Sequence, residues 1–182
     1  MIPLLEETPQ VLAARDHWRY RGQERPPFAE TPAAGQESVW DYPRPPVIED
    51  CLQRLEVRLA DQVVASTLRG RRVAETASAA TYYFPPEDVL AELTPTGARS
   101  LCEWKGVAQS LTVAGVPDAA WRYVQMFPAF QSLYNWIAFY PSKLDCFVGE
   151  ERVRPQPGGY YGGWVTRDLA GPIKGEPGSG NW

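Results

Sequence analysis

The sequence predicts a mainly β protein with one or two short helices and an irregular N-terminal arm. Two observations point to this class. Hydrophobic residues alternate with polar ones between Leu55 and Thr67, which is typical of strands with one buried face. In addition, 18 prolines and 15 glycines interrupt the 182 residues at short intervals. This spacing favours short strands and turns over long helices.

The first helix is expected in the arm. Thr8 is a good N-cap and Pro9 suits the first helical position, so the sequence predicts a short helix over residues 10–20. We expect the arm to pack on the domain through Trp18 and Tyr20. The proline-rich segment 37–46 should then be extended, because residues before proline avoid the helical region.

From Leu55 onward, the sequence predicts a series of short strands separated by Gly, Pro and polar turns. The strand candidates are residues 55–59, 63–67, 81–84, 101–105, 110–113, 119–123, 136–140, 146–148 and 152–154. A helical turn is expected after residue 84 and a short helical or irregular link at 127–135. The tail 155–182 is expected to wrap the domain without regular structure, held by Tyr160, Tyr161 and Trp164.

Composition excludes several classes of function. The formal net charge of −4 argues against general nucleic-acid binding, which uses surplus Lys and Arg to displace counterions. The N-terminus lacks the features of a signal peptide, and no apolar run approaches the roughly 20 residues of a spanning helix. We therefore expect a cytoplasmic protein that binds neither nucleic acid nor membranes.

No metal site and no cofactor are expected. The three cysteines are scattered without a Cys-x-x-Cys pair, and His17 is the single histidine. Reduced thiols are the default in the cytoplasm.

Seven strings along the chain resemble a small, mostly bacterial family known as domain of unknown function four-two-seven, which is also labelled nucleotidyltransferase-like. They are "ESVWDYPRPP", "YYFPPEDV", "CEWKG", "AAWRY", "AFYPSKLD", "PGGYYGGW" and "GPIKGEPG". The resemblance covers residues 37–182 and leaves out the arm, residues 1–36. It implies one β-tent-like domain, a fold of two antiparallel sheets leaning together. It transfers no catalytic role, only motif residues: Glu75, Tyr83, Pro86, Glu87, Asp88, Cys102, Lys105, Gly106, Trp121 and Tyr140.

Cys102 is the candidate catalytic residue. If residues 101–105 form a strand, Cys102 and Trp104 share one face and Lys105 points to the other. The thiol would then need an activator from a neighbouring strand, such as Arg122. The alternative is a buried cysteine that behaves as a small hydrophobe.

Aromatic residues give the candidate ligand site. Trp104, Trp121 and Trp136 lie on different predicted strands, with Tyr83 and Tyr140 near strand ends, and could line one pocket between the sheets. Ring faces stack on planar groups and attract cations. The alternative is that these rings belong to the core.

Three functions remain open from the sequence. The first is a module that binds a planar or cationic small molecule through Glu75, Tyr83, Trp104, Lys105, Trp121 and Tyr140. The second is an enzyme that uses the Cys102 thiol, or, with less support, a nucleotidyltransferase-like enzyme that uses Glu87 and Asp88. The third is an interaction protein whose arm mediates self-association as a homodimer. A thiol that lines an open pocket favours the second function, and a sealed thiol favours the first or third.

Overall fold

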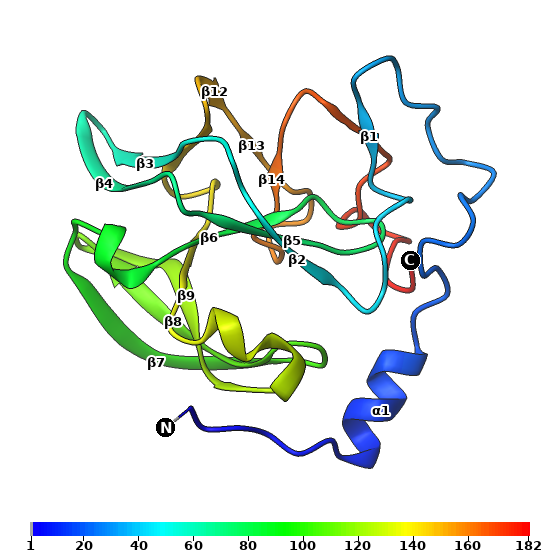
Figure 1. The fold of residues 1–182 in the computed structure, drawn as a ribbon, viewed down its shortest axis with the longest axis horizontal. Coiled ribbons are helices and arrows are strands. Elements are labelled where there is room, and N and C mark those ends of the chain that lie inside the picture. Colours follow the sequence, from blue (N-terminus) through cyan, green and yellow to red (C-terminus); the bar gives the residue numbers. More distant parts are fainter. Residues whose placement is uncertain (1) are drawn as a thin grey trace.

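Two antiparallel sheets form the body of the protein in the computed structural model, which describes residues 2–182 (Figure 1). The larger sheet has seven strands in the order β2-β5-β6-β10-β9-β8-β7. Their bounds are β2 Val47–Asp50, β5 Arg71–Ala74, β6 Thr81–Phe84, β7 Leu93–Cys102, β8 Gly106–Val113, β9 Val116–Met126 and β10 Ile137–Phe139. The predicted mainly β class with a pair of antiparallel sheets is confirmed.

The smaller sheet has four strands in the order β12-β11-β3-β4. They are β3 (Leu55–Leu59), β4 (Gln62–Thr67), β11 (Asp145–Val148) and β12 (Glu151–Arg152). Strands β3 and β4 form the hairpin that the period-two pattern predicts, and β11 and β12 form the predicted closing hairpin. The local sequence therefore determines this sheet well.

The main core lies between the two sheets. Leu55, Val57 and Cys146 of the smaller sheet pack there against Phe84 and Phe139 of the larger one. Burying such side chains contributes roughly 1.5–3 kcal/mol each. This layer is the principal source of stability.

A second apolar cluster covers the opposite face of the seven-stranded sheet. Successive side chains on a strand point to opposite faces, so Phe84 enters the main core while Tyr83 enters the second cluster. In the same way Ala120 faces the main core and Trp121 faces outward. The aromatic site expected between the sheets therefore lies on the outer face of the larger sheet.

The N-terminal arm crosses this outer side and contains the helix α1 (Pro9–Asp16) (Figure 1). Thr8 caps it as predicted, because its Oγ1 accepts a hydrogen bond from the Val11 backbone amide at 3.3 Å. The helix ends at Asp16 rather than at residue 20. It ends there because the following residues bind the domain: the Trp18 indole Nε1 donates to Glu103 Oε1 at 2.6 Å.

Two short 3₁₀ helices, η1 (Pro86–Asp88) and η2 (Pro128–Leu133), occupy the two expected helical turns. None of the helices among residues 2–182 has the length and apolarity needed to cross a bilayer.

The tail is more regular than expected. It contributes β13 (Arg154–Pro155), β14 (Trp164–Val165) and β15 (Leu169–Ala170), and β15 pairs in parallel with β1 (Glu37–Ser38). Trp164 is fully buried and its Nε1 donates to the Phe139 carbonyl at 3.0 Å. The expectation of a tail without strands was wrong. Two-residue strands are too short to give a pattern in the sequence, and β15 also depends on β1, far away along the chain.

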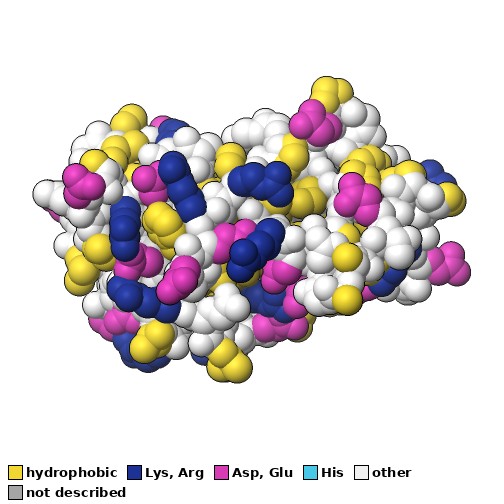
Figure 2. Space-filling view, turned by 90° about the horizontal axis from the view of Figure 1, so that it is seen from above, with side chains coloured by type: hydrophobic (Ala, Val, Ile, Leu, Met, Phe, Trp, Pro, Cys, Tyr) yellow, Lys and Arg dark blue, Asp and Glu magenta, His cyan; other side chains and the backbone are white. Residues whose placement is uncertain are grey.

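Charged side chains of both signs are interspersed on the face seen in Figure 2. Among the ion pairs of the protein, that of Arg69 with Glu87 is exposed on both sides. Exposed pairs of this kind contribute little stability.

Candidate functional site

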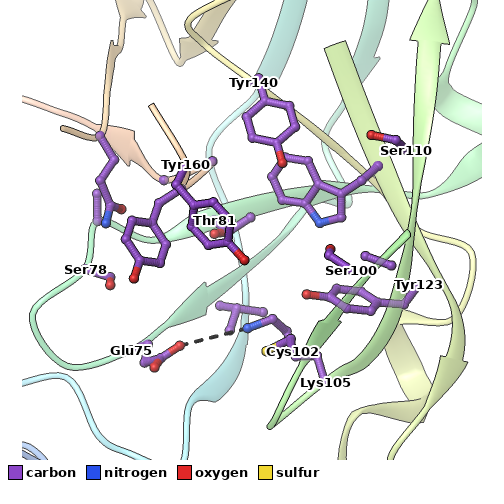
Figure 3. A pocket seen from close by; sticks show the side chains of 18 of the residues that line it. Glu75, Ser78, Thr81, Ser100, Cys102, Lys105, Ser110, Tyr123, Tyr140 and Tyr160 are labelled. Carbon is purple, nitrogen blue, oxygen red and sulfur yellow. Dashed lines mark ion pairs between the residues drawn. The ribbon is translucent and has the colours of Figure 1, made fainter. Parts of the chain in front are cut away.

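A pocket of about 620 Å³ opens on the outer face of the seven-stranded sheet (Figure 3). Its walls come from strands β6 to β9, from the arm through Trp18, and from the tail through Tyr160, Tyr161 and Lys174. Five of the six predicted ligand-binding residues and Cys102 line this space: Glu75, Tyr83, Lys105, Trp121 and Tyr140.

Cys102 and Lys105 are neighbours at one end of the pocket (Figure 3). Strand β7 ends at Cys102, residues 103–105 turn, and Cys102 pairs with Gly106 at the start of β8. The prediction of a strand through Lys105 was wrong, and with it the inference that Lys105 faces away from the thiol. The reversal occurs because Gly106 adopts φ +129°, which other residues rarely reach.

Cys102 is half-buried and lies at the edge of the second apolar cluster. It is therefore not the sealed core thiol that was the alternative interpretation. The other two cysteines differ. Cys51 and Cys146 are buried, and burial raises the pKa of both thiols.

Lys105 belongs to a buried charge network. Its Nζ lies 3.9 Å from Glu75 Oε2, and Glu75 Oε1 accepts a hydrogen bond from Arg44 Nε at 3.1 Å. Burial opposes the ammonium charge, but Cys102, Tyr83 and Glu75 outweigh it and raise the pKa of Lys105 above its usual value. Lys105 is therefore a fixed positive charge beside the thiol.

Aromatic rings form the walls of the pocket. The Trp121 and Tyr140 rings lie 4.4 Å apart between centroids, and Tyr83 meets Trp121 edge-on at 6.5 Å. The tail approaches Trp121 so closely that a Cβ on Gly162 would collide with the indole ring. The pocket therefore offers flat apolar surfaces in fixed orientations.

The Tyr83 hydroxyl is buried close to Tyr123 and Trp121 but makes no hydrogen bond of good geometry within residues 2–182. Burial raises the pKa of Tyr83 to about 12, so the hydroxyl keeps its proton at neutral pH. A buried unpaired hydroxyl costs about 1–3 kcal/mol. A ligand atom that accepts its hydrogen bond would recover that cost.

Trp104 does not line the pocket, although the sequence suggested it as a ligand contact. It is buried below the turn at residues 103–105, where the Arg15 guanidinium lies 5.1 Å from its ring centroid. The turn places Trp104 on the arm side. Arg122, the suggested activator of Cys102, instead donates to Gln109 on β8.

The sequence reasoning missed Trp18 and Lys174 as pocket residues. Lys174 is 2% exposed, and its Nζ lies 3.6 Å from the Trp18 ring centroid and 4.7 Å from that of Tyr161. The available signals were its place in the quoted string "GPIKGEPG" and its position as the single lysine of the Gly- and Pro-rich tail. Within residues 2–182, no group of three or more His, Cys, Asp or Glu residues is placed to hold a metal ion.

A family model described as "Domain of unknown function (DUF427)", with the short name NTP_transf_9, matches residues 47–150. The protein belongs to the DUF427 family. A search of curated proteins found no match.

The pocket combines residues inside and outside the segment that matches DUF427. Glu75, Tyr83, Cys102, Lys105 and Trp121 lie within the match, whereas the arm and tail contacts lie outside it. Of the carboxylates suggested for nucleotide transfer, Asp88 accepts from Thr67 and Arg69, and Glu87 pairs with Arg69. Neither lines the pocket, so the label in the family name gains no support from their positions.

Chemically, the DUF427 pocket combines flat apolar walls with several hydrogen-bond donors and a thiol beside a fixed positive charge. The Tyr83 hydroxyl and the amines of Lys105 and Lys174 all lie in or at its walls. Such a site can hold a planar molecule and orient its oxygen atoms.

Proposed function

We propose that this protein binds a small planar molecule that carries oxygen acceptors, and that the pocket on the outer face of the larger sheet is the binding site. The observation that carries the proposal is the unpartnered Tyr83 hydroxyl in an aromatic pocket of about 620 Å³. Pockets for small molecules are typically about 300–1,000 Å³, mostly apolar, with a few convergent polar groups.

The donors of the pocket favour an acceptor-bearing ligand over a cationic one. Lys174 already places its own amine over the Trp18 and Tyr161 rings, which is where a cationic ligand would gain most. Lys105 adds a second positive charge to the lining of the same pocket. A carboxylate or phenolic oxygen can accept from Tyr83 and Lys105, while an ammonium ligand meets repulsion.

Calorimetric titration with three probes tests this proposal. Para-hydroxybenzoate is planar and rich in acceptors, cyclohexanecarboxylate has the charge without the flat ring, and benzyltrimethylammonium is aromatic and cationic. We expect para-hydroxybenzoate to bind at least about tenfold more tightly than either of the others, because stacking on Trp121 and Tyr140 contributes about 0.5–1.5 kcal/mol per ring pair.

Two tyrosine variants locate the binding site. Tyr140→Leu removes a half-buried ring of the pocket and should weaken para-hydroxybenzoate severalfold. Tyr134→Leu removes a tyrosine of similar exposure outside the pocket and should leave binding unchanged. Equal effects of both variants, or no preference among the three probes, would contradict the proposal.

A second candidate function is chemistry at the Cys102 thiol. It is favoured by a specific observation, because Cys102 lines the pocket and lies beside the positive charge of Lys105. Reactive cysteines are typically found in partly exposed positions near positive charge. A ligand held against the aromatic walls would place its atoms within reach of this thiol.

A further inference from the structure

We propose that Lys174 captures a carbonyl group of the bound molecule as a reversible imine. The natural ligand would then be a planar aldehyde or ketone that also carries an acceptor group. This inference rests on the proposed function, since it assigns a chemical class to the molecule in the same pocket.

The backbone fixes Lys174 at the wall of the pocket. Its amide donates to the Ala77 carbonyl at 2.7 Å, and its carbonyl accepts from Gln156 Nε2 at 2.9 Å. Gln156 is itself buried, so both anchors belong to the interior. Lysine side chains on surfaces lose much entropy when they are ordered, whereas this one is already ordered before any ligand arrives.

The amine of Lys174 has aromatic neighbours and no anionic partner. Its Nζ contacts the ring faces of Trp18 and Tyr161. Within residues 2–182 this amine has neither a hydrogen bond nor an ion pair. The nearby carboxylates are engaged elsewhere: Glu75 by Arg44 and Lys105, and Glu103 by the Trp18 indole. The ring faces attract the ammonium form, but burial without a carboxylate partner disfavours it relative to the neutral amine.

This environment changes the ionisation of the amine. Burial, together with the positive charges of Arg44 and Lys105, lowers the pKa of Lys174 to about 8, although Glu75 and Glu103 act in the opposite direction. At pH 7 about a tenth of the Lys174 side chains are therefore neutral, compared with fewer than about one in a thousand for an ordinary lysine. Buried lysines with a lowered pKa are the ones that form Schiff bases.

The reaction balances without an added oxidant or reductant. The nitrogen lone pair of neutral Lys174 attacks the carbonyl carbon, and the electrons of the C=O double bond move to the oxygen. That oxygen takes a proton while the nitrogen loses one, which gives a carbinolamine. Loss of the hydroxyl with one further proton as water leaves the C=N double bond. Water reverses the sequence and releases the carbonyl compound.

The two other lysines of the chain lack this combination. Glu75 and other neighbours keep the Lys105 amine protonated, and their effect on its pKa exceeds the opposing effect of burial. Lys143 is exposed and donates to the Pro117 carbonyl at 2.8 Å. The three lysines therefore provide an internal comparison within one molecule.

Reductive trapping of the full-length wild-type protein tests the inference. The protein is incubated at pH 7 with para-formylbenzoate and cyanoborohydride, and the adduct on each lysine is followed by peptide mass spectrometry. We expect Lys174 to react at least about tenfold faster than Lys143, because of its larger neutral fraction. Between pH 7 and pH 9 the rate at Lys174 should rise about tenfold.

Terephthalate, which has the same shape without an aldehyde, serves as the competitor. It should slow trapping at Lys174 more than at Lys143, which is exposed although it also lines the pocket. The variant Lys174→Met should lose the fast adduct, but the decisive comparison is made in the wild type and needs no variant to fold.

The outcomes separate the two proposals. If terephthalate binds by calorimetry while Lys174 reacts no faster than Lys143, the imine inference is overturned and the binding function stands. Fast trapping that terephthalate does not slow would also overturn it, since the amine would then act outside the ligand site. If neither terephthalate nor para-hydroxybenzoate binds, the proposed function itself fails.

Discussion

At the residue scale, the chain reversal at residues 103–105 determines which side chains reach the pocket, and so determines its chemistry. Lys105 and Cys102 belong to one turn, and both line the pocket. Cys51 and Cys146 are buried in the main core instead. Of the three cysteines, Cys102 is therefore the one whose thiol lies at the pocket.

Alkylation of the native protein should follow this difference. We expect iodoacetamide at pH 7.5 to modify Cys102 at least about tenfold faster than Cys51 or Cys146, because burial both shields the latter two and raises the pKa of their thiols. Site-resolved mass spectrometry over time measures the three rates. Protection of Cys102 by saturating para-hydroxybenzoate would place the thiol in the ligand site, and a rate equal to that of the buried cysteines would refute its accessibility.

The sequence predicted that aromatic and charged residues would line a pocket, but it predicted only in part which residues come together there. The quoted strings contain Tyr83 and Trp121, and the family resemblance also pointed to Glu75; all three line the pocket. Trp104 was expected in the pocket but lies outside it, whereas Lys174 was not expected there but lines it. Alternation along an assumed strand misplaced Trp104. The string "GPIKGEPG" contains Lys174, but nothing in it reveals the contacts with Trp18 and Tyr161 that bring this lysine to the pocket.

At the element scale, hairpins with alternating sequences were predictable and the edge strand was not. Strands β3 and β4 have one buried face, so their pattern is visible in the sequence. Strand β7 is exposed along most of its ten residues, which include Pro95 and Gly97, so hydrophobic periodicity is missing. Its extended conformation comes from pairing with β8, which the sequence alone does not reveal.

The turn between β7 and β8 has a requirement that can be tested. Gly106 has a positive φ, and a Cβ there would collide with the Gln125 carbonyl on β9. Gly115 also has a positive φ, but a Cβ there would meet nothing within 4 Å. Gly106→Ala should therefore lower the free energy of unfolding by at least about 2 kcal/mol, and Gly115→Ala by about 1 kcal/mol.

Urea unfolding of both glycine variants measures this difference. The clash at Gly106 should also displace Lys105 from Cys102, so the alkylation rate of Cys102 should change in Gly106→Ala alone. Equal destabilisation of the two variants would mean that the backbone of β9 yields to the new methyl group, and that the close packing of the turn does not hold Lys105 in place.

At the scale of the whole molecule, the site is assembled from three stretches of chain that are far apart in the sequence. The sheet supplies the floor, the arm supplies Trp18, and the tail supplies Tyr161 and Lys174. Arm and tail also meet each other, since the Trp182 carbonyl accepts from Arg44, which in turn lies 4.6 Å from the Trp18 ring centroid. Arm and tail lie outside the residues 47–150 that match the family model, so the match does not cover this part of the pocket wall.

Trp18 is the contact through which the arm should control binding. Trp18→Leu removes the hydrogen bond to Glu103 and the ring beneath Lys174, and should cost roughly 2 kcal/mol of stability and weaken para-hydroxybenzoate at least about tenfold. Trp18→Phe keeps a ring face and should lose less of both. Leu12→Ala, at an exposed position of α1, should change neither.

Urea unfolding and calorimetric titration of these three variants separate two roles of the arm. If Trp18→Leu lowers stability without weakening binding, the arm stabilises the fold but does not contribute to the binding site. Parallel losses, graded from Leu to Phe, would mean that the arm is part of the binding site. In that case the fast trapping of Lys174 should also slow in Trp18→Leu, because the amine would lose the ring that positions it over the ligand.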